Sequence, residues 1–465
     1  MMETDMRYDI REFGAIGDGK TVNTEPIAAA VAAAASAGGG TVVVPPGIFV
    51  TGVFGLASHV TLELTPGSVL KGSGELSDYE LDGERTGLMY TKDAEHVAIV
   101  GQGTIDGNGM QFMSDTHVRH RPDGYSACNP ACTRQGEAYL ASDEDVRDGP
   151  VRPLDRPCQM LCFVDCKHVQ LRDVTIQEPA HWTLRFGNCD RVSVQGVTIE
   201  NNMLVPNNDG IHCTQCTNVR ISDCDIRAGD DCIAFTGFFD HPGHGFGNPP
   251  RDAEHLVVTN CILSSASAGI RIGAGQSPVR NVTITNCVMR QVHRGVVIWQ
   301  RDGNTLENIR INNLMIHTRL LAGKWWGQAE PIAISSVRRR EDTRPGMIRH
   351  VHISQITAHT EGGIMLYSET PGEIEDVLLD DVRLYLHNSP ANPTHGGNFD
   401  LRPVEGRPKL AIFKHDLYPV YARGVDNLVV RNLAVERDAD MPDWFHGKPR
   451  LHGCREAVVD GEYTG

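Results

Sequence analysis

Three aspartates with the chemistry of an acid and base pair lie close together in the middle of the chain. They are Asp209, Asp230 and Asp231, within the segment PNNDGIHCTQCTNVRISDCDIRAGDDCIAFTG at 206–237. The 21-residue spacing from Asp209 to Asp230 fits one coil of a β-solenoid. In such a coil the two positions would lie roughly 4.8 Å apart on neighbouring strands. Three carboxyl groups would then share one patch of the protein.

Crowded carboxyl groups suit the cleavage of a glycosidic bond with inversion. That reaction needs one protonated carboxyl to donate to the leaving oxygen and one carboxylate to deprotonate water, roughly 6.5 to 9.5 Å apart. Like charges held together cannot all ionise, so one pKa rises and the two roles separate. An aspartate at a solenoid corner can instead bond only to the backbone, as we expect of Asp173 and Asp223. Two adjacent acids without a task would be a costly placement, which favours a catalytic role for the trio.

A recurring pattern of alternating apolar residues predicts the scaffold that positions these acids. From Val169 onward the order apolar, any, apolar, any, small polar, apolar, any, apolar repeats, with its shared polar position 23 to 51 residues apart. Period-two alternation indicates strands, and a base period in the middle twenties suits one coil of a parallel β-helix. Asn and Asp tolerate a left-handed backbone and can bond along a stack, which explains their recurrence. The shared positions are Asp173, Gly196, Asp223, Asn260, Asn286, Asn313, Gln355, Asp381 and Asn432.

A helix is predicted at the start of this solenoid. Asn23 and Thr24 can cap it, Pro26 lies in its first turn, and three glycines at 38–40 end it. A helix in this place would cover the first exposed coil. Weaker coils at 60–70 and 97–107 connect it to the main repeats.

We therefore predict an all-β fold, a parallel β-helix that forms one domain over 1–465, with an N-terminal cap at about 1–50. A β-sandwich or a propeller is the alternative, although neither needs repeats of such uneven length. Two segments interrupt the repeats, at about 108–156 and 387–420. Loops of this length in a compact fold are usually functional or disordered, and beside one face of a solenoid they would wall a cleft.

Composition limits the partners that we expect. With 43 basic and 59 acidic residues the formal net charge is −16, which disfavours nucleic acid and anionic membrane surfaces. No apolar stretch approaches the roughly 18 residues of a membrane span, and the first residues lack the features of a secretory signal. The sequence as given predicts a cytoplasmic protein, or a secreted or periplasmic one whose signal has been removed. Its oligomeric state is not indicated.

Six of the 13 cysteines lie in or beside predicted strands, where buried thiols explain them better than disulfides or metal. Cys128 and Cys132 lie in a loop, and a metal role stays open for this pair alone. The six strand cysteines are Cys189, Cys213, Cys224, Cys232, Cys261 and Cys287.

The chain also resembles glycoside hydrolase family 28, the polygalacturonase group of right-handed parallel β-helix enzymes. The resemblance implies a carbohydrate substrate, with Asp230 as the general acid, Asp209 and Asp231 activating water, and inversion at the anomeric carbon. Neither a cofactor nor a metal is predicted. The motifs that carry the resemblance are FGAIGDGKTVNTEPI at 13–27, GTIDGNG at 103–109, NNDG at 207–210 and GDDCIAF at 229–235.

The chain departs from the family on the two coils after the acids. Polygalacturonases carry Gly-His-Gly on the first of these coils and Arg-Ile-Lys on the second, where the basic pair binds the uronate carboxylate. Aligned by coil, Ala268 stands in place of the His, and Val297 and Trp299 stand in place of the Arg and Lys. The sequence Gly-His-Gly itself occurs around His244, in a loop, and the sequence Arg-Ile occurs at Arg271. A solenoid fixes position by coil, so we follow the coil register and keep both residues as substrate-binding candidates.

Tryptophans near the acids offer flat faces for a neutral sugar. A missing Lys removes a charge-assisted contact worth roughly 1.5 to 3 kcal/mol, enough to change the preferred substrate. Core packing is the alternative for each tryptophan, although the adjacent pair at 325–326 cannot both face the core of one strand. The substrate-binding candidates are therefore Trp182, Trp299, Trp325 and Trp326, together with His244 and Arg271, and with Asn207 and His212 beside Asp209.

Three functions stay open. The favoured one is an inverting glycoside hydrolase that cleaves α-glycosidic bonds in a pectin-related or other polysaccharide, with exo action expected over that of a typical endo-polygalacturonase. The second is a pectate-type β-helix lyase that uses Ca²⁺, for which the acid trio would be the metal site. The third is a non-catalytic carbohydrate-binding β-helix. Unsaturated products that chelator abolishes would indicate the lyase, and binding without turnover would indicate the third.

Overall fold

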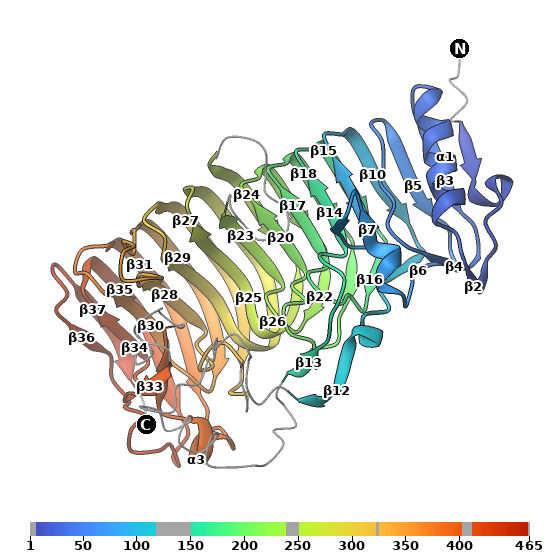
Figure 1. Ribbon diagram of the computed structural model, residues 1–465. Helices are drawn as coiled ribbons and strands as arrows, with labels where there is room; N and C mark the ends of the chain where they lie inside the picture. Colours follow the sequence, from blue (N-terminus) through green and yellow to red (C-terminus); the bar gives the residue numbers. More distant parts are fainter. Residues whose placement is uncertain (1–5, 118–149, 239–250, 322–324, 402–411, 464–465) are drawn as a thin grey trace.

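The structure is a computed structural model that describes residues 6–117, 150–238, 251–321, 325–401 and 412–463. Its strands wind into one long solenoid, in which 31 strands join a continuous sheet. Each strand pairs in parallel with the equivalent strand of the next coil (Figure 1). The predicted parallel β-helix is therefore confirmed.

Each coil presents three faces, and the first consists of short strands. It comprises β9 (Met89–Lys92), β14 (Leu161–Val164), β17 (Leu184–Gly187), β20 (Ile211–Thr214), β23 (Ile233–Gly237), β28 (Ile332–Ser336), β30 (Ile364–Ser368), β34 (Val420–Arg423) and β36 (Arg450–His452).

The second face begins with β1 (Arg7–Asp9), β3 (Gly40–Val44), β5 (Val60–Leu64), β10 (Glu95–Gly101), β15 (Lys167–Arg172), β18 (Asp190–Gln195), β21 (Thr217–Ser222) and β24 (Ala253–Thr259). The third face begins with β2 (Asp18–Val22), β4 (Gly47–Thr51), β6 (Ser68–Gly72), β11 (Thr104–Asp106), β16 (Thr175–Gln177), β19 (Thr198–Glu200) and β22 (Asp225–Ala228). Later strands run on through the corners. They are β25 (Ile262–Gly275), β26 (Val279–Gln300), β27 (Thr305–Thr318), β29 (Met347–Thr360), β31 (Ile374–Leu386), β35 (Val425–Arg437) and β37 (Val458–Tyr463).

The core is a set of apolar columns that run along the axis of the solenoid. Alternation places every second side chain of a strand inside, and the parallel register stacks equivalent side chains coil upon coil. Burying each branched side chain contributes roughly 1.5 to 3 kcal/mol. One column, almost fully buried throughout, contains Val169, Val192, Val219, Leu256, Val282, Ile309, Val351, Val377 and Leu428.

Two corners of each coil are made by residues with a left-handed backbone. The corner between the second and third faces falls at the predicted polar positions, from Asp173 to Asn432, and all nine have positive φ. Side chains there bond along the stack as expected, for example from Asn260 Nδ2 to Asp223 Oδ1 at 3.2 Å. The corner that opens the second face was not predicted. It is formed by His59, His96, His168, Arg191, Asn218, His255, Asn281, Asn308, His350, Asp376 and Asn427, again with positive φ.

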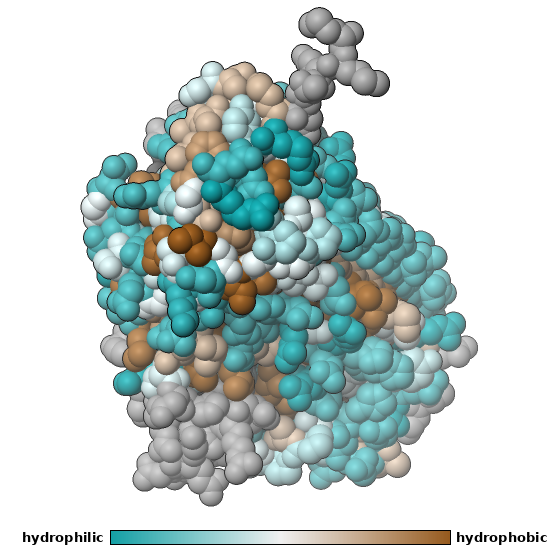
Figure 2. All heavy atoms as spheres, turned by 90° about the vertical axis from the view of Figure 1, so that its right-hand side faces the viewer, coloured by the Kyte–Doolittle hydropathy of each residue, from teal (hydrophilic) through white to brown (hydrophobic). Residues whose placement is uncertain are grey.

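The predicted N-terminal helix is present as α1 (Thr24–Ser36) and packs against β1, β3 and β5 of the first coils (Figure 1). It buries Ile27, Ala30, Val31 and Ala34. Asn23 precedes the helix, but its side chain makes no cap bond there and instead binds the backbone of Ile16 and Val50. Figure 2 views this end of the molecule, where apolar residues form separate small patches among polar ones.

Both predicted insertions depart from the coils, and their described parts contain short elements. The first carries η3 (Gly109–Phe112) and the antiparallel pair β12 (Met113–His117) and β13 (Val151–Pro153). The second carries α3 (Asn392–His395) and the antiparallel pair β32 (Asn398–Asp400) and β33 (Ile412–Lys414). Both insertions lie along the lower side of the solenoid in Figure 1. The remaining short elements are η1 (Ile10–Phe13), η2 (Leu76–Tyr79), β7 (Glu80–Leu81) and β8 (Glu84–Arg85).

The six strand cysteines are buried and free, as predicted. Cys128, Cys132 and His244 lie outside the described residues. Within the described ranges, no helix has the length and apolar character needed to cross a membrane.

Candidate active site

The three predicted acids meet at the start of two neighbouring strands of the first face. Asp209 precedes β20 and Asp231 precedes β23. Because Ile211 pairs with Ile233, Asp209 lies in register with Asp231, and Asp230 is displaced by one residue. The expected direct stacking of Asp209 on Asp230 was therefore wrong by one position. All three side chains are nonetheless buried.

Asp231 is paired with a buried arginine from the next coil. Arg271 Nε donates to Asp231 Oδ2, and Arg271 Nη2 lies 3.7 Å from Asp209 Oδ2. Asp231 Oδ1 accepts from Ser267 Oγ at 3.1 Å and from the Ala268 N–H at 3.3 Å. Burial lowers the pKa of Arg271, but the neighbouring carboxylates outweigh that effect and raise it, so the guanidinium stays charged.

Asp209 has a different environment, with one oxygen bound and one open. Its Oδ2 lies 3.0 Å from His212 Nδ1, while His212 Nε2 lies 3.2 Å from Thr236 Oγ1. Its Oδ1 is buried and finds no hydrogen-bond partner among the described residues. Burial, followed by the charges of Asp230 and Asp231, raises the pKa of Asp209 well above the ordinary value of an aspartate, although Arg271 opposes this.

Asp230 is the most accessible of the three acids, at 8% exposure against 2% and 1%. Its Oδ1 accepts from the Asp231 N–H at 3.0 Å, and its Oδ2 lies 3.4 Å from Asn207 Nδ2. The predicted substrate-binding residue Asn207 therefore also contacts an acid directly. A group approaching from outside would reach Asp230 before the other two.

Arg156 anchors the loop that carries Asn207, and it was not predicted. Its guanidinium donates to the backbone oxygens of Ala180 at 2.7 Å and Pro206 at 2.9 Å, and to Asn207 Oδ1 at 3.3 Å. The first insertion is thereby tied to the acid site. Its only sequence signal was its place at the end of that insertion, since an arginine alone does not indicate which backbone it will bind.

Two of the predicted tryptophans border the acids. Trp182 stacks on His212 with ring centroids 3.8 Å apart, and its own position lies one coil before Asp209. Trp299 lies between two guanidinium groups, with Arg271 Cζ at 5.6 Å and Arg301 Cζ at 5.4 Å from its ring centroid. Both tryptophans are mostly buried, at 7% and 8% exposure, so each presents at most an edge to a ligand.

The adjacent tryptophans at 325–326 belong to a loop and not to a strand. Trp325 is buried against Ala266 and Leu321, whereas Trp326 is half-buried. This agrees with the expectation that the two cannot both face the core. The second insertion reaches the same loop, since the Gly327 N–H donates to Asp400 Oδ2 at 2.6 Å.

The coil register of the departures is as predicted. The Cys232 N–H donates to the Ala268 oxygen, and Arg271 pairs with Val297 on the following coil. Ala268 thus lies beside Asp231 on the next coil, and Val297 and Trp299 lie on the coil after Arg271. Arg271 itself reaches the acids, a role that the register alone left undecided.

The acid cluster is held together by contacts within the protein. Asp231 already accepts three hydrogen bonds from protein groups. No cluster of three or more His, Cys, Asp or Glu side chains suited to a metal ion occurs in the described part of the chain. Carboxyl groups with different surroundings therefore lie around one guanidinium, and such carboxyl groups can give and take protons.

The stacked coils and this acid cluster define a parallel β-helix protein with a buried site of three carboxyl groups. The family model described as Glycosyl hydrolases family 28 matches residues 135–315, a range that includes all three acids. The resemblance to family 28 predicted from the motifs is therefore confirmed.

Curated proteins and solved structures related to polygalacturonases are also similar to this chain. A probable polygalacturonase of Vitis vinifera is 29% identical over 285 residues, or 57% of this chain and 51% of that protein. An exo-poly-alpha-D-galacturonosidase of Dickeya chrysanthemi is 25% identical over 340 residues, or 66% of this chain and 50% of that protein. The chain spans about half the length of these curated relatives. The crystal structure of a hyperthermoactive exopolygalacturonase from Thermotoga maritima matches with a TM-score of 0.64 at 23% identity, over 83% of this chain and 88% of that one. This likeness confirms the predicted right-handed parallel β-helix.

Proposed function

We propose that the protein is an inverting glycoside hydrolase that removes terminal units from a pectin-related or other polysaccharide by cleaving α-glycosidic bonds. The observation that carries the proposal is the meeting of Asp209, Asp230 and Asp231 around Arg271 on two neighbouring coils. An acid and a base with different environments are what inversion requires.

Accessibility and hydrogen bonding support separate roles for the acids. Asp230, the most exposed, would give its proton to the glycosidic oxygen as the bond from that oxygen to the anomeric carbon breaks. A water would attack the same carbon from the opposite side and lose its proton to Asp209. The open Oδ1 of Asp209 can hold that water, and its raised pKa makes it a stronger base. Asp231 and Arg271 would orient Asp209.

The substrate unit beside the acids is proposed to be neutral. The guanidinium of Arg271 is already used by two carboxylates and by the Gly273 oxygen, which it reaches at 3.0 Å. Val297 and Trp299 replace the basic pair of the polygalacturonases, and the nearby cations Arg294 and Arg301 are themselves buried, at 2% exposure each. Like charges in a buried site repel, and a neutral sugar avoids that cost.

Exo action is supported by the insertions and by the name of one relative. Arg156 ties the first insertion to the acid site, and Asp400 ties the second to the Trp326 loop. Walls on the groove shorten the length of glycan that can bind across it. The Dickeya chrysanthemi relative is called an exo-poly-alpha-D-galacturonosidase, which is compatible with this geometry.

The test is a screen of neutral and uronate-containing oligosaccharides and chromogenic glycosides, with the product anomer followed by NMR. We expect a neutral or side-chain-bearing substrate to be cleaved with inversion, without effect of EDTA. Calcium-dependent formation of unsaturated products would favour the lyase instead. Rapid cleavage of unmethylated polygalacturonate, at enzyme levels typical of a pectinase, would contradict the proposed preference.

A further inference from the structure

A row of stacked imidazoles runs along the outer surface at the corner that opens the second face. His96 stacks on His59 with ring centroids 5.4 Å apart and on His168 at 4.3 Å. Arg191 takes the same corner position on the next coil. All four side chains are exposed. Successive coils therefore place an imidazole or guanidinium at intervals of roughly 4.8 Å along the solenoid axis.

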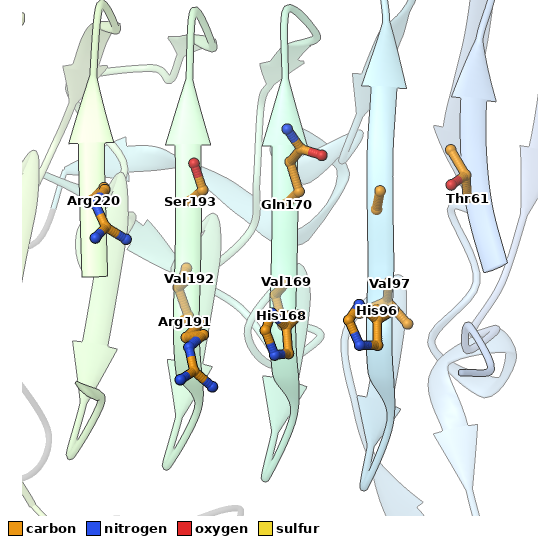
Figure 3. Close-up of a pocket in the computed structure, with 11 residues that line it drawn as sticks. Thr61, His96, Val97, His168, Val169, Gln170, Arg191, Val192, Ser193 and Arg220 are labelled. Carbon is orange, nitrogen blue, oxygen red and sulfur yellow. The ribbon is translucent and has the colours of Figure 1, made fainter. Parts of the chain in front are cut away.

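A second row beside these residues contains no acid. On β5, β10, β15, β18 and β21 the outward side chains in register are Thr61, Ala98, Gln170, Ser193 and Arg220. Figure 3 shows the first row from His96 to Arg191 beside the second row across these strands. All members of the two rows except His59 line a hollow of about 470 Å³. We call His59, His96, His168, Arg191 and Arg220 the basic strip.

The charges of the basic strip are only partly used within the protein. His59 Nε2 lies 3.8 Å from Glu95 Oε1, and Arg191 Nη1 lies 3.4 Å from Asp190 Oδ2. Lys167 adds a further cation at the start of β15. By contrast, neither His168 nor Arg220 forms a hydrogen bond or an ion pair with any described residue. The strip thus offers positive charge on a chain whose net charge is −16.

We propose that the basic strip binds a linear carboxylate-bearing polysaccharide, which lies along the solenoid axis outside the acid site. A repeating row of cations suits a repeating row of anions, and Thr61, Gln170 and Ser193 can bind sugar hydroxyls. A duplex nucleic acid would require many more Lys and Arg contacts to its phosphates. The strip would hold the anionic stretches of a mixed polymer whose neutral units enter the acid site.

The identity of the polymer rests on the proposed function, but its binding can be measured without catalysis. The probe is unmethylated polygalacturonate, with affinity electrophoresis and calorimetry at about pH 5.5. The protein carries Asp230→Asn, so that the polymer stays intact. We expect binding that weakens steeply as salt is added, because the contacts are exposed ion pairs.

The test variant is His96→Asn/His168→Asn/Arg220→Gln. Asn tolerates the left-handed backbone of the corner, so the coils are expected to keep their shape. The matched control is His255→Asn/His350→Asn/Arg310→Gln, which changes the same corner and the same outward row on coils away from the hollow. We expect at least a tenfold loss of polygalacturonate affinity in the test variant and less than a twofold change in the control.

Equal losses in both variants, or no binding by the starting protein, would overturn the inference. Tighter binding of a DNA duplex or of phosphatidylserine vesicles at the same salt concentration would also overturn it. The proposed function is assessed separately, by turnover of a short neutral substrate in the variants that retain Asp230. That turnover should be unchanged in the test variant, so a failure of catalysis and a failure of the strip give different results.

Discussion

Arg271 is the residue that makes three buried acids compatible with a folded coil. Unpaired buried charges are strongly unfavourable, and removal of one partner from a buried pair typically costs about 3 to 5 kcal/mol. Arg271 contacts two of the three carboxylates, and its position is set by the rung on which it lies. This one side chain stabilises the acid cluster. Its guanidinium is occupied by those contacts, so it is not available to bind a ligand.

The first prediction concerns Asp230. Replacing it with Asn keeps its shape and removes its proton, so we expect turnover to fall by about 10² to 10⁴, the usual contribution of general acid catalysis. Circular dichroism and the melting temperature should remain close to those of the parent. Full activity in this variant would remove Asp230 from the mechanism.

The second prediction is that Asp209 lowers the stability of the folded protein at neutral pH but is required for activity. Its pKa is raised in the folded protein, so folding takes up a proton between the ordinary aspartate pKa of about 3.9 and the raised value. The stability contributed by this side chain therefore falls as pH rises through that interval. Asp209→Asn removes the effect. We expect the variant to be inactive yet more stable than the parent at pH 7, with no gain below about pH 4.

Thermal melts from pH 3.5 to pH 8 would check this second prediction. Asp173→Asn is the control, because that side chain lies at an exposed corner away from the acid site. A variant that is less stable than the parent at pH 7 would show that the bond from Asp209 to His212 outweighs the cost of burying the charge.

The acids and the missing basic pair could be predicted from the sequence because motif and coil register together determine them. The sequence could not show that the Arg271 side chain would point toward the acids. A side chain on a strand can point into or out of the coil, and its rotamer depends on the residues that pack around it. It also could not show Arg156, whose partners are the backbone oxygens of two separate positions and the side chain of Asn207. Contacts made through the backbone leave no pattern of residue types.

At the scale of elements, the left-handed corners hold the coils in register. The polar corner was predictable because Asn and Asp recur at it, and only a few residue types tolerate positive φ. The other corner is shared among His, Arg, Asn and Asp, a set of residues that is common on any protein surface, so no comparable pattern marks it. The α1 helix was predictable because its start and stop residues act locally.

The third prediction tests the polar corner through Asn260, whose φ is +58°. Asn260→Val places a β-branched residue in a left-handed conformation, which costs at least about 1 to 2 kcal/mol. Asn260→Gly fits the backbone and loses the side-chain bonds to Asp223 and from Thr259 Oγ1, a net loss of about 0.5 to 1.5 kcal/mol for each. We expect the urea midpoint to be highest for the parent, lower for Asn260→Gly and lowest for Asn260→Val. A Val variant as stable as the Gly variant would contradict the role of backbone handedness.

At the scale of the whole molecule, the solenoid is a long open surface that its insertions divide. The fourth prediction is that a polymer accepted by the enzyme loses single terminal units, with reducing sugar released well before its viscosity falls. Product sizes measured by chromatography would check this. Early appearance of mid-sized fragments would show that the groove is open at both ends and that the insertions do not limit it.

The two corners have a consequence for how such a chain can change. From His168 and Asp173 to Asn427 and Asn432, the corner residues of every coil are five positions apart. The second face therefore has one fixed length throughout, while successive coils differ by up to 28 residues, from 23 to 51. All of that difference lies outside this interval, in segments that flank the first face and its acids. Insertions and deletions can thus reshape the region around the acid cluster while the stacked coils keep their register, so new ligand preferences can arise without a new fold.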